Sequence, residues 1–391
     1  MGFLFSSKKK KMVAIFDIGS GSVGGALVYM PTEGELLPTI IKSTRTNIIN
    51  RAEVNFNLFL EDMILALGAT SRNLYQSKLG APDEIVCVLA SPWYISETRT
   101  IKMSKNHSFT FTKKIVDELL KKEITSLTNV YKNKYGEIES LPLVVESPIV
   151  GISLDGLRVS NPIGGQARSI EMNMIVTLSP KLCLDKIKES VSRNFHHTPI
   201  SFSSFMVASY VSIRDKYINS GPYLLLDVGG EVTDIGIVLN DILMGSVSFP
   251  YGKETLFRNM CKELKIELRD ARELFNLYSQ GNLSDQKIAK VISALESAKI
   301  SWGKSFKEGV DVLSQNCMLP NLLFLTIDAD VKDFFVKIIN NEKYIKSLTK
   351  TTVVPLDGSL FLDMCNVKNG ICDPFLMIES ISVMRKMGKY E

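Results

Sequence analysis

Two stretches of the sequence place an aspartate before a glycine-rich turn, with an apolar run on each side. The first is DIGSGSVGGALV (residues 17–28) and the second is DVGGEVTDIGIV (residues 227–238), 210 residues further on. Glycine lets backbone N–H groups approach phosphate oxygens, and hydroxyl side chains add donors. An aspartate beside each turn can hold Mg²⁺ through water. The repetition predicts two hairpins that face each other across a cleft and clamp a phosphate group.

The candidate site residues all lie in these two stretches. A single glycine turn in a hairpin needs no ligand, so the second copy is what favours a binding site. The alternative is that both are structural turns of a duplicated core. The candidates are Asp17, Gly19, Ser20, Gly21, Ser22, Asp227, Gly229, Gly230, Thr233 and Asp234, with Asp17 and Asp227 on the metal side.

Composition is that of an ordinary globular protein. The chain has 391 residues, of which 45% are hydrophobic and 23% charged, enough for two to three domains. Its apolar runs are shorter than the roughly 18 residues of a membrane span, and the N-terminus lacks a secretory signal. Six scattered cysteines without a CxxC pair indicate reduced thiols, and three histidines suggest no metal set. A net charge of +4 over 391 residues says little about a nucleic-acid partner, and we expect none.

The elements that must position the two turns follow from hydrophobic periodicity. Each turn joins two β-branched apolar strands, which is typical of a hairpin. No Pro/Gly/Ser-rich linker separates the segments, so we expect closely packed domains. Helices are predicted over 55–78, 112–136, 180–195, 202–218 and 253–316, and strands at 84–90, within 143–178 and at 322–331.

The paired turns resemble the phosphate-1 and phosphate-2 motifs of the actin/Hsp70/sugar-kinase superfamily. Within it, LDGLRVSNPIGGQARSIEMNMIVTLS (154–179) is similar to a stretch of the bacterial cell-division family FtsA that actin lacks. PilM, a type IV pilus family, is the sister family and shares nearly all of this pattern. The resemblance implies an α/β, two-lobed actin-like (ribonuclease-H-like) ATPase fold, with a small α+β subdomain inserted in the first lobe.

The same resemblance implies how the chain is divided. We expect an apolar and basic N-terminal tail, two lobes, and a C-terminal segment that packs on the core. The predicted segments are the tail (1–11), the first lobe (12–92), the inserted FtsA-type (SHS2-type) subdomain (93–178), the return to the first lobe with an interlobe helix (179–220), the second lobe (221–345) and the C-terminal segment (346–391).

Several residues depart from the motifs of an active ATP site. In the phosphate-2 turn, which usually reads DxGGGTTD, Glu231 stands in place of the third glycine and Val232 in place of a threonine. A carboxylate there repels a γ-phosphate unless it points away. Thr233 and Asp234 keep the rest of the motif.

The adenosine side departs further. Glycines normally follow the apolar strand there, whereas this chain has Ile327, Asp328 and Ala329. In the A-E-x-x-K helix near the base, Arg272 and Phe275 replace Glu and Lys. ATP with Mg²⁺ is the cofactor that the fold implies, but these changes predict weakened or lost binding and, at most, a slow ATPase. A shifted alignment of these motifs is the alternative.

Both termini allow a membrane contact. Phe3, Leu4 and Phe5 can enter the headgroup region, and Lys8, Lys9, Lys10 and Lys11 can attract anionic lipid of the inner membrane. At the C-terminus, Ile378, Ile381, Met384 and Met387 form an apolar stripe that serves equally for a membrane helix or for a helix docked on the core. We favour docking, which assigns membrane contact to residues 1–11.

Three functions follow from the resemblance. The first is an FtsA-like adaptor, cytoplasmic and peripheral at the inner face of the membrane, that binds a tubulin-like division protein or another divisome component and self-associates. The second is a PilM-like assembly protein that holds a peptide of an inner-membrane pilus component. The third is an active ATPase of the same fold. The Asn-Pro-Ile-Gly segment favours the first over the second, and the altered ATP motifs disfavour the third.

Overall fold

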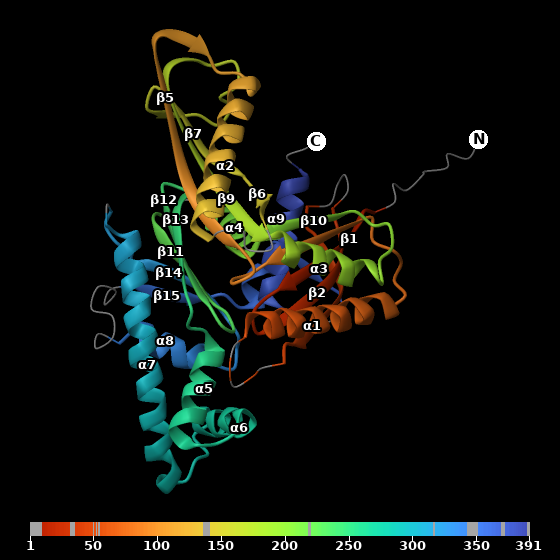
Figure 1. Cartoon of the computed structure of the whole chain (residues 1–391), viewed down its shortest axis with the longest axis vertical. Helices are drawn as coiled ribbons and strands as arrows, with labels where there is room; N and C mark the ends of the chain where they lie inside the picture. Colours follow the sequence, from red (N-terminus) through yellow and green to blue (C-terminus); the bar gives the residue numbers. More distant parts are fainter. Residues whose placement is uncertain are drawn as a thin grey trace, which may run out of the picture.

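Three β-sheets and the helices packed on them make up the described part of the chain (Figure 1). A long helix lies toward each end of the molecule. The computed structural model describes residues 10–31, 36–49, 51, 53, 55–135, 141–217, 220–315, 317–341, 351–368 and 372–388.

The first sheet contains the first glycine turn and defines the first lobe. Its strand order is β10-β4-β1-β2-β3-β16. Strand β1 is buried along its whole length, because helices cover both faces of the sheet, and it therefore reads as a continuous apolar run. The strands are β1 (Met12–Ile18), β2 (Ser22–Tyr29), β3 (Thr39–Asn47), β4 (Glu84–Leu89), β10 (Ile200–Ser204) and β16 (Asn366–Val367); the helices are α1 (Phe56–Gln76), α3 (Lys181–Ser192), α4 (Phe205–Lys216) and α9 (Pro374–Met387).

The second sheet contains the second glycine turn and defines the second lobe. Its order is β13-β12-β11-β14-β15. Aromatic side chains fill its core, where Trp302 stacks on Phe306 and meets Phe335 edge-on. The strands are β11 (Tyr223–Val228), β12 (Thr233–Leu239), β13 (Ile242–Phe249), β14 (Leu322–Ile327) and β15 (Thr352–Pro355); the helices are α5 (Lys253–Leu264), α6 (Leu268–Ser279), α7 (Asp285–Leu313) and α8 (Lys332–Ile339).

The third sheet projects beyond the two lobes and carries helix α2 (Lys113–Tyr135) on one face (Figure 1). Leu127 of α2 is fully buried against Met174, Val176 and Leu178 of β9, which is why this small sheet has a core of its own. The order is β5-β9-β7-β8, with β6 also paired to β9. The strands are β5 (Ile95–Thr110), β6 (Pro142–Glu146), β7 (Ile149–Leu154), β8 (Leu157–Arg158) and β9 (Gln166–Pro180).

The third sheet packs against the second lobe at the β12–β13 turn. A Cβ atom on Gly151 of β7 would lie 2.7 Å from Cδ1 of Ile242, so the Ile242 side chain packs directly over this glycine. Thr98 of β5 donates a hydrogen bond to the Leu243 carbonyl at 3.4 Å, and Arg158 donates to the Asn240 carbonyl. The inserted sheet therefore contacts β13 as well as the lobe from which it emerges.

Glu146, at the end of β6, joins the third sheet to the first lobe. Its carboxylate accepts hydrogen bonds from the Ser204 N–H at 2.7 Å and from the hydroxyls of Ser203 and Ser204. It also forms an ion pair with Lys386 of α9. Because Ser204 begins α4, this carboxylate satisfies a donor at the helix N-terminus.

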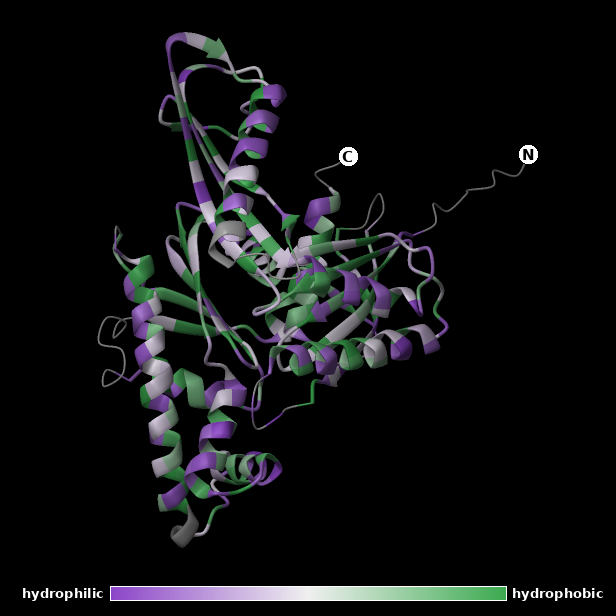
Figure 2. Ribbon diagram, in the orientation of Figure 1, coloured by the Kyte–Doolittle hydropathy of each residue, from purple (hydrophilic) through white to green (hydrophobic). Residues whose placement is uncertain are grey.

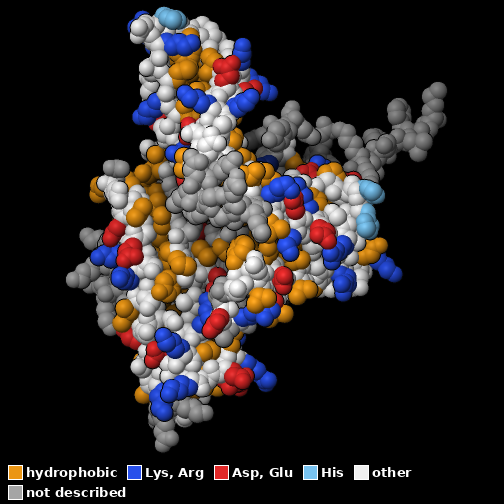
Figure 3. Space-filling model, in the orientation of Figure 1, with side chains coloured by type: hydrophobic (Ala, Val, Ile, Leu, Met, Phe, Trp, Pro, Cys, Tyr) orange, Lys and Arg blue, Asp and Glu red, His pale blue; other side chains and the backbone are white. Residues whose placement is uncertain are grey.

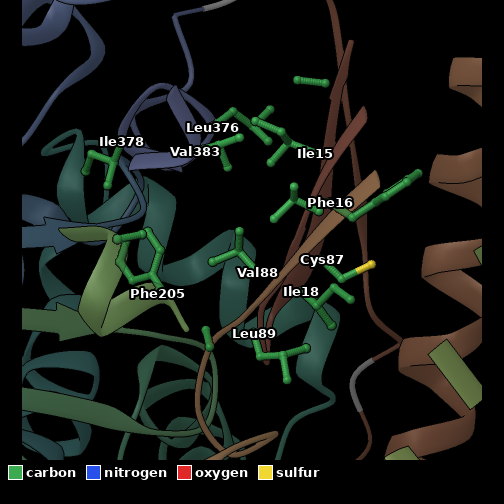
Figure 4. Close-up of a cluster of buried hydrophobic side chains, with 14 of the residues drawn as sticks. Ile15, Phe16, Ile18, Cys87, Val88, Leu89, Phe205, Leu376, Ile378 and Val383 are labelled. Atoms are coloured by element: carbon green, nitrogen blue, oxygen red, sulfur yellow. The ribbon is translucent and has the colours of Figure 1, made fainter. Parts of the chain in front are cut away.

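Helix α9 is packed into the first lobe. Leu376, Ile378 and Ile381 are fully buried, and Figure 4 shows side chains of this helix beside those of β1 and α4. Asp373 caps the helix by accepting hydrogen bonds from the N–H groups of Phe375 and Leu376. Of the two arrangements open from the sequence, the structure has the docked one.

The surface shows no segregation of charge on the face drawn in Figure 3, where Lys and Arg side chains are interspersed with Asp and Glu. Figure 2 shows the strands of the lobes as mainly hydrophobic, whereas α2 and α7 alternate hydrophobic with hydrophilic residues. In the described residues, no helix is both long enough and apolar enough to cross a membrane.

Candidate functional site

The two Asp-Gly turns have the same local geometry. In the first, the Gly19 N–H donates to the Ser22 carbonyl at 3.1 Å, and in the second the Gly229 N–H donates to the Val232 carbonyl at 3.0 Å. A Cβ atom on either glycine would lie 2.9 Å from that carbonyl oxygen, so both positions require glycine. The similarity seen in the sequence therefore extends to the backbone.

The turns are in direct contact with each other. The Glu231 N–H donates to the Ser20 hydroxyl at 3.0 Å. A Cβ atom on Gly230 would lie 2.5 Å from the Gly21 nitrogen and 2.6 Å from its Cα. The structure thus brings the two predicted hairpins together, but the turns touch, and the expected gap for a phosphate group between Gly21 and Gly230 is closed.

The N-terminus of α5 is also occupied by the second turn. The N–H groups of Lys253 and Glu254 donate to the carbonyls of Gly229 and Gly230 at 3.0 and 2.8 Å. Free N–H groups at a helix start bind anions readily. Here these two donors are satisfied within the protein, which removes them as phosphate ligands.

The carboxylate of Glu231 does not point toward the first turn. It forms a two-point ion pair with the guanidinium of Arg258 in α5, whose Nη1–Oε1 distance is 2.8 Å. Such fork-to-carboxylate pairs are both strong and directional. The sequence identified Glu231 as a departure from the motif, but it gave no signal for Arg258 as its partner.

A cavity of about 440 Å³ lies beside the turns, on the adenosine side of the fold. Its charged side chains neutralise one another: Lys253 pairs with Asp328 at 2.5 Å, and Arg272 pairs with Glu254. A polyphosphate entering it would meet carboxylates that already hold the cations. Its lining consists of Gly21, Ser22, Arg45, Asn47, Lys253, Glu254, Arg272, Asp328, Ala329 and Asp330.

The predicted metal-side aspartates occupy different environments. Asp17 is buried and its Oδ2 lies 2.8 Å from Nη1 of Arg45, so a protein cation already holds it. Asp227 is buried too, and its Oδ1 has no hydrogen-bond partner. Burial raises the pKa of Asp227 well above its usual value, and the nearby carboxylates of Asp234 and Asp17 raise it further. This pair does not fit a hydrated Mg²⁺ bound to ATP.

The remaining candidates lie around these aspartates or outside the described residues. Thr233 is fully buried and donates to the Tyr251 carbonyl, while Asp234 accepts a hydrogen bond from Ser91 of the first lobe at 2.8 Å. Among the residues the structure describes, no three His, Cys, Asp or Glu side chains are grouped so as to hold a metal ion. Of the predicted membrane residues, Phe3, Leu4, Phe5, Lys8 and Lys9 lie outside the described part, and Lys11 pairs with Glu84.

Comparisons with known proteins show the fold. No family model matches the sequence, and no curated protein matches it either. The chain superposes on the PilM–PilN type IV pilus biogenesis complex with a TM-score of 0.63 and 11% identity, covering 97% of this chain and 98% of that one. A weaker match is EutJ, an ethanolamine utilization protein from Carboxydothermus hydrogenoformans (TM-score 0.43, 10% identity, 96% and 90% covered). Another is the apo ParM protein of psk41 (TM-score 0.41, 10% identity, 98% and 100% covered).

The predicted fold class is therefore confirmed: the chain has an actin-like ATPase fold over nearly its whole length. PilM is among the structurally similar proteins, and at 11% identity this likeness shows the fold alone. Fold alone does not determine activity.

Replacing Gly230 with alanine should separate the two turns. The added methyl would overlap backbone atoms of Gly21, which cannot move as a flexible side chain does, so we expect a loss of stability of about 3 kcal/mol. Thermal unfolding followed by circular dichroism measures it. Gly68→Ala in helix α1 is the matched control. Its methyl would meet only the Ser190 side chain of α3, at 3.6 Å, and the variant should be more stable than wild type by up to about 1 kcal/mol. Equal melting temperatures for Gly230→Ala and wild type would contradict the contact.

The stability of the Asp234→Asn variant relative to wild type should depend on pH. Burial raises the pKa of Asp234 to about 6, so the folded state binds this proton more tightly than the unfolded chain. The stability that wild type gains from this bound proton is lost as pH rises from about 4 to about 6, and none of it remains at neutral pH. The variant lacks that loss, so its stability relative to wild type should increase by about 2 kcal/mol between pH 4.5 and pH 7.5.

Unfolding measured at several pH values tests this, with Asp311→Asn on the exposed face of α7 as the control. The difference between that control and wild type should stay nearly constant with pH. A similarly constant difference for Asp234→Asn would show that the Asp234 carboxyl is not protonated more readily in the fold.

Proposed function

We propose that this protein is a non-enzymatic adaptor with an actin-like fold that works without an ATP cycle. The observation that carries the proposal is the contact of Gly21 with Gly230, where ATP phosphates would have to lie. The paired charges Lys253–Asp328 and Arg272–Glu254 in the neighbouring cavity support the same conclusion. In this proposal the lobes form a binding platform rather than a catalytic cleft.

The structural comparison favours a pilus-type assembly as the machinery that the adaptor serves. The matched PilM chain belongs to a type IV pilus biogenesis complex with PilN, and the match extends over nearly all of both chains. On this proposal the present chain holds a component of a comparable membrane-bound machine. The inserted subdomain predicted over residues 93–178, whose sheet has a core of its own, offers a surface on which such a component docks.

A role in cell division is the second candidate, with a tubulin-like protein as the partner and self-association as a further property. It is favoured by the segment 154–179 with its Asn-Pro-Ile-Gly, which resembles the FtsA family. Within this segment, Asp155 accepts hydrogen bonds from the N–H groups of Arg168 and Ser169 at 2.9 and 2.7 Å. These bonds lower the pKa of Asp155 and keep its carboxylate charged.

Membrane attachment through residues 1–11 belongs to the same proposal. Because α9 is buried in the first lobe, it is not exposed for lipid binding. Lys8 to Lys11 would give a salt-sensitive attraction to anionic lipid, each contributing on the order of 1 kcal/mol near the surface. Phe3, Leu4 and Phe5 would add apolar burial, so that binding is reversible.

The wild-type protein should not bind ATP with useful affinity. We expect equilibrium binding of labelled ATP with Mg²⁺ to show no saturable site tighter than about 1 mM, because the turn contact would have to open first. Asp17→Ala and Asp227→Ala should leave that weak signal unchanged. Low-micromolar binding, lost in both variants, would contradict the proposal and restore the nucleotide site.

Removal of the protein from its own cells should distinguish the two machines. We expect loss of surface pili if the pilus-type role holds, and filamentous undivided cells if the division role holds. Complementation with a chain that begins at Met12 should restore neither phenotype fully, because its membrane contact is lost.

The full-length chain is the control in this complementation, together with fluorescence localisation of both forms. Equal membrane localisation of the two forms would exclude residues 1–11 as the anchor. Normal division together with normal piliation after depletion would contradict both candidate functions.

A further inference from the structure

Three residues on neighbouring strands of the first sheet lie in one row. Asp17 of β1 is opposite Gly24 of β2, and Gly24 is opposite Arg45 of β3. Side chains at paired positions point to the same face of a sheet. Arg45 and Asp17 therefore lie on the same face of the sheet, on either side of Gly24, which has no side chain.

Gly24 leaves the space through which the guanidinium crosses β2. A Cβ atom at this position would lie 2.7 Å from Nη2 and 3.0 Å from Cζ of Arg45. The arginine passes over the glycine and reaches Oδ2 of Asp17 at 2.8 Å. This glycine of the first hairpin thus makes room for an ion pair.

The guanidinium of Arg45 has several partners, although its Nη2 makes no hydrogen bond of good geometry. Nη1 donates to the Ser22 hydroxyl at 2.9 Å, Nε donates to Oδ2 of Asp373 at 2.8 Å, and Nη2 lies 2.8 Å from the same carboxylate oxygen. The group also lies over the Phe375 ring, with Cζ 5.1 Å from the centroid. Asp373 is the residue that caps α9, so Arg45 connects the first hairpin to the C-terminal helix.

A third carboxyl group lies within the field of this cluster. Glu379 of α9 is fully buried, and neither of its oxygens has a hydrogen-bond partner by distance. Burial raises its pKa well above the usual value, and the carboxylate of Asp17 raises it further. Burial alone would lower the pKa of Arg45, but Asp17 and Asp373 raise it, so the guanidinium is permanently charged.

We propose that Arg45 is a resident cation that occupies the site beside Asp17 in place of a divalent metal ion. The guanidinium supplies the positive charge, while Ser22, Asp373 and Phe375 fix its position. The first hairpin and the docked α9 are then held together without Mg²⁺ or nucleotide. The inference extends the proposed loss of ATP binding, but it concerns the metal side and has its own test.

An exogenous ion would compete poorly at this site. The arginine is attached to the sheet, so its effective concentration at Asp17 is fixed by the fold. A divalent ion would have to release both ion pairs of Arg45 and leave a partly buried guanidinium without a partner, which is unfavourable. The wild-type protein should therefore show the same melting temperature with Mg²⁺, with EDTA and in NaCl of matched ionic strength.

The test removes the resident cation and supplies another. We expect Arg45→Ala to lower the melting temperature by about 5–10 °C, because Asp17 and Asp373 are left buried without a counter-charge. Mg²⁺ or low guanidinium, each at about 10 mM, should recover about half of that loss in the variant and nothing in the wild type. Arg45→Lys, which keeps a charge, should lose less and show no response to Mg²⁺.

Two controls separate charge from packing. Arg45→Met retains most of the side-chain volume without the charge and should be as unstable as Arg45→Ala; wild-type stability in this variant would reduce Arg45 to a packing role and overturn the proposal. Arg51→Ala breaks a pair with one buried carboxylate, Asp62, and should lose stability without a Mg²⁺ response.

Further outcomes decide between the two proposals. Stabilisation of the wild type by Mg²⁺ would overturn the resident cation. The assignment of Arg45 would also be overturned by two results together. Neither Mg²⁺ nor guanidinium would raise the melting temperature of Arg45→Ala, and Arg45→Lys would be as unstable as Arg45→Met. ATP binding that needs no Mg²⁺ would contradict the proposed function and leave the assignment of Arg45 intact.

Discussion

The backbone contact between Gly21 and Gly230 is the constraint on which the arrangement of the two lobes depends. Gly230 has no room for a Cβ atom, a Cβ atom on Gly21 would lie 3.3 Å from the Gly230 Cα, and the Ser20 hydroxyl accepts the Glu231 N–H across the same boundary. The Ser91–Asp234 hydrogen bond adds a second link between the lobes. Because these contacts are made by the chain itself, the closed arrangement needs no ligand to bridge it.

Local sequence predicted the hairpins, but it could not predict how they meet. Apolar β-branched runs around an Asp-Gly turn fix a strand pair, and the turn alone sets Asp17 opposite Gly24. The position of Arg45 depends on the register of β3, which follows a longer connection and includes an irregularity between Leu27 and Val28. That register is decided by tertiary packing, so the ion pair with Asp17 has no short-range signal.

The C-terminal helix shows a similar limit of periodicity. An apolar stripe with basic residues beside it suits a lipid surface and a protein core equally, and the sequence left both open. The docked arrangement depends on residues far from this helix in the sequence. The Ser212 hydroxyl donates to the Ile378 carbonyl, and Phe205 packs against Phe375. Glu379 is the informative residue, because a fully buried carboxyl within an apolar stripe indicates a specific polar neighbour, here Asp17 with its arginine.

A closed cleft also limits how this protein can be regulated. A ligand shifts a conformational equilibrium by the difference in its affinity for the two states, and under the proposed function ATP would have to part the Gly21–Gly230 contact before it could bind. The inserted sheet meets the second lobe through Ile242 and the first through Glu146, so a partner on that sheet contacts a unit coupled to both lobes. Under the proposed function, control of the adaptor would lie in the concentration of its partners and in membrane attachment, because occupancy follows mass action.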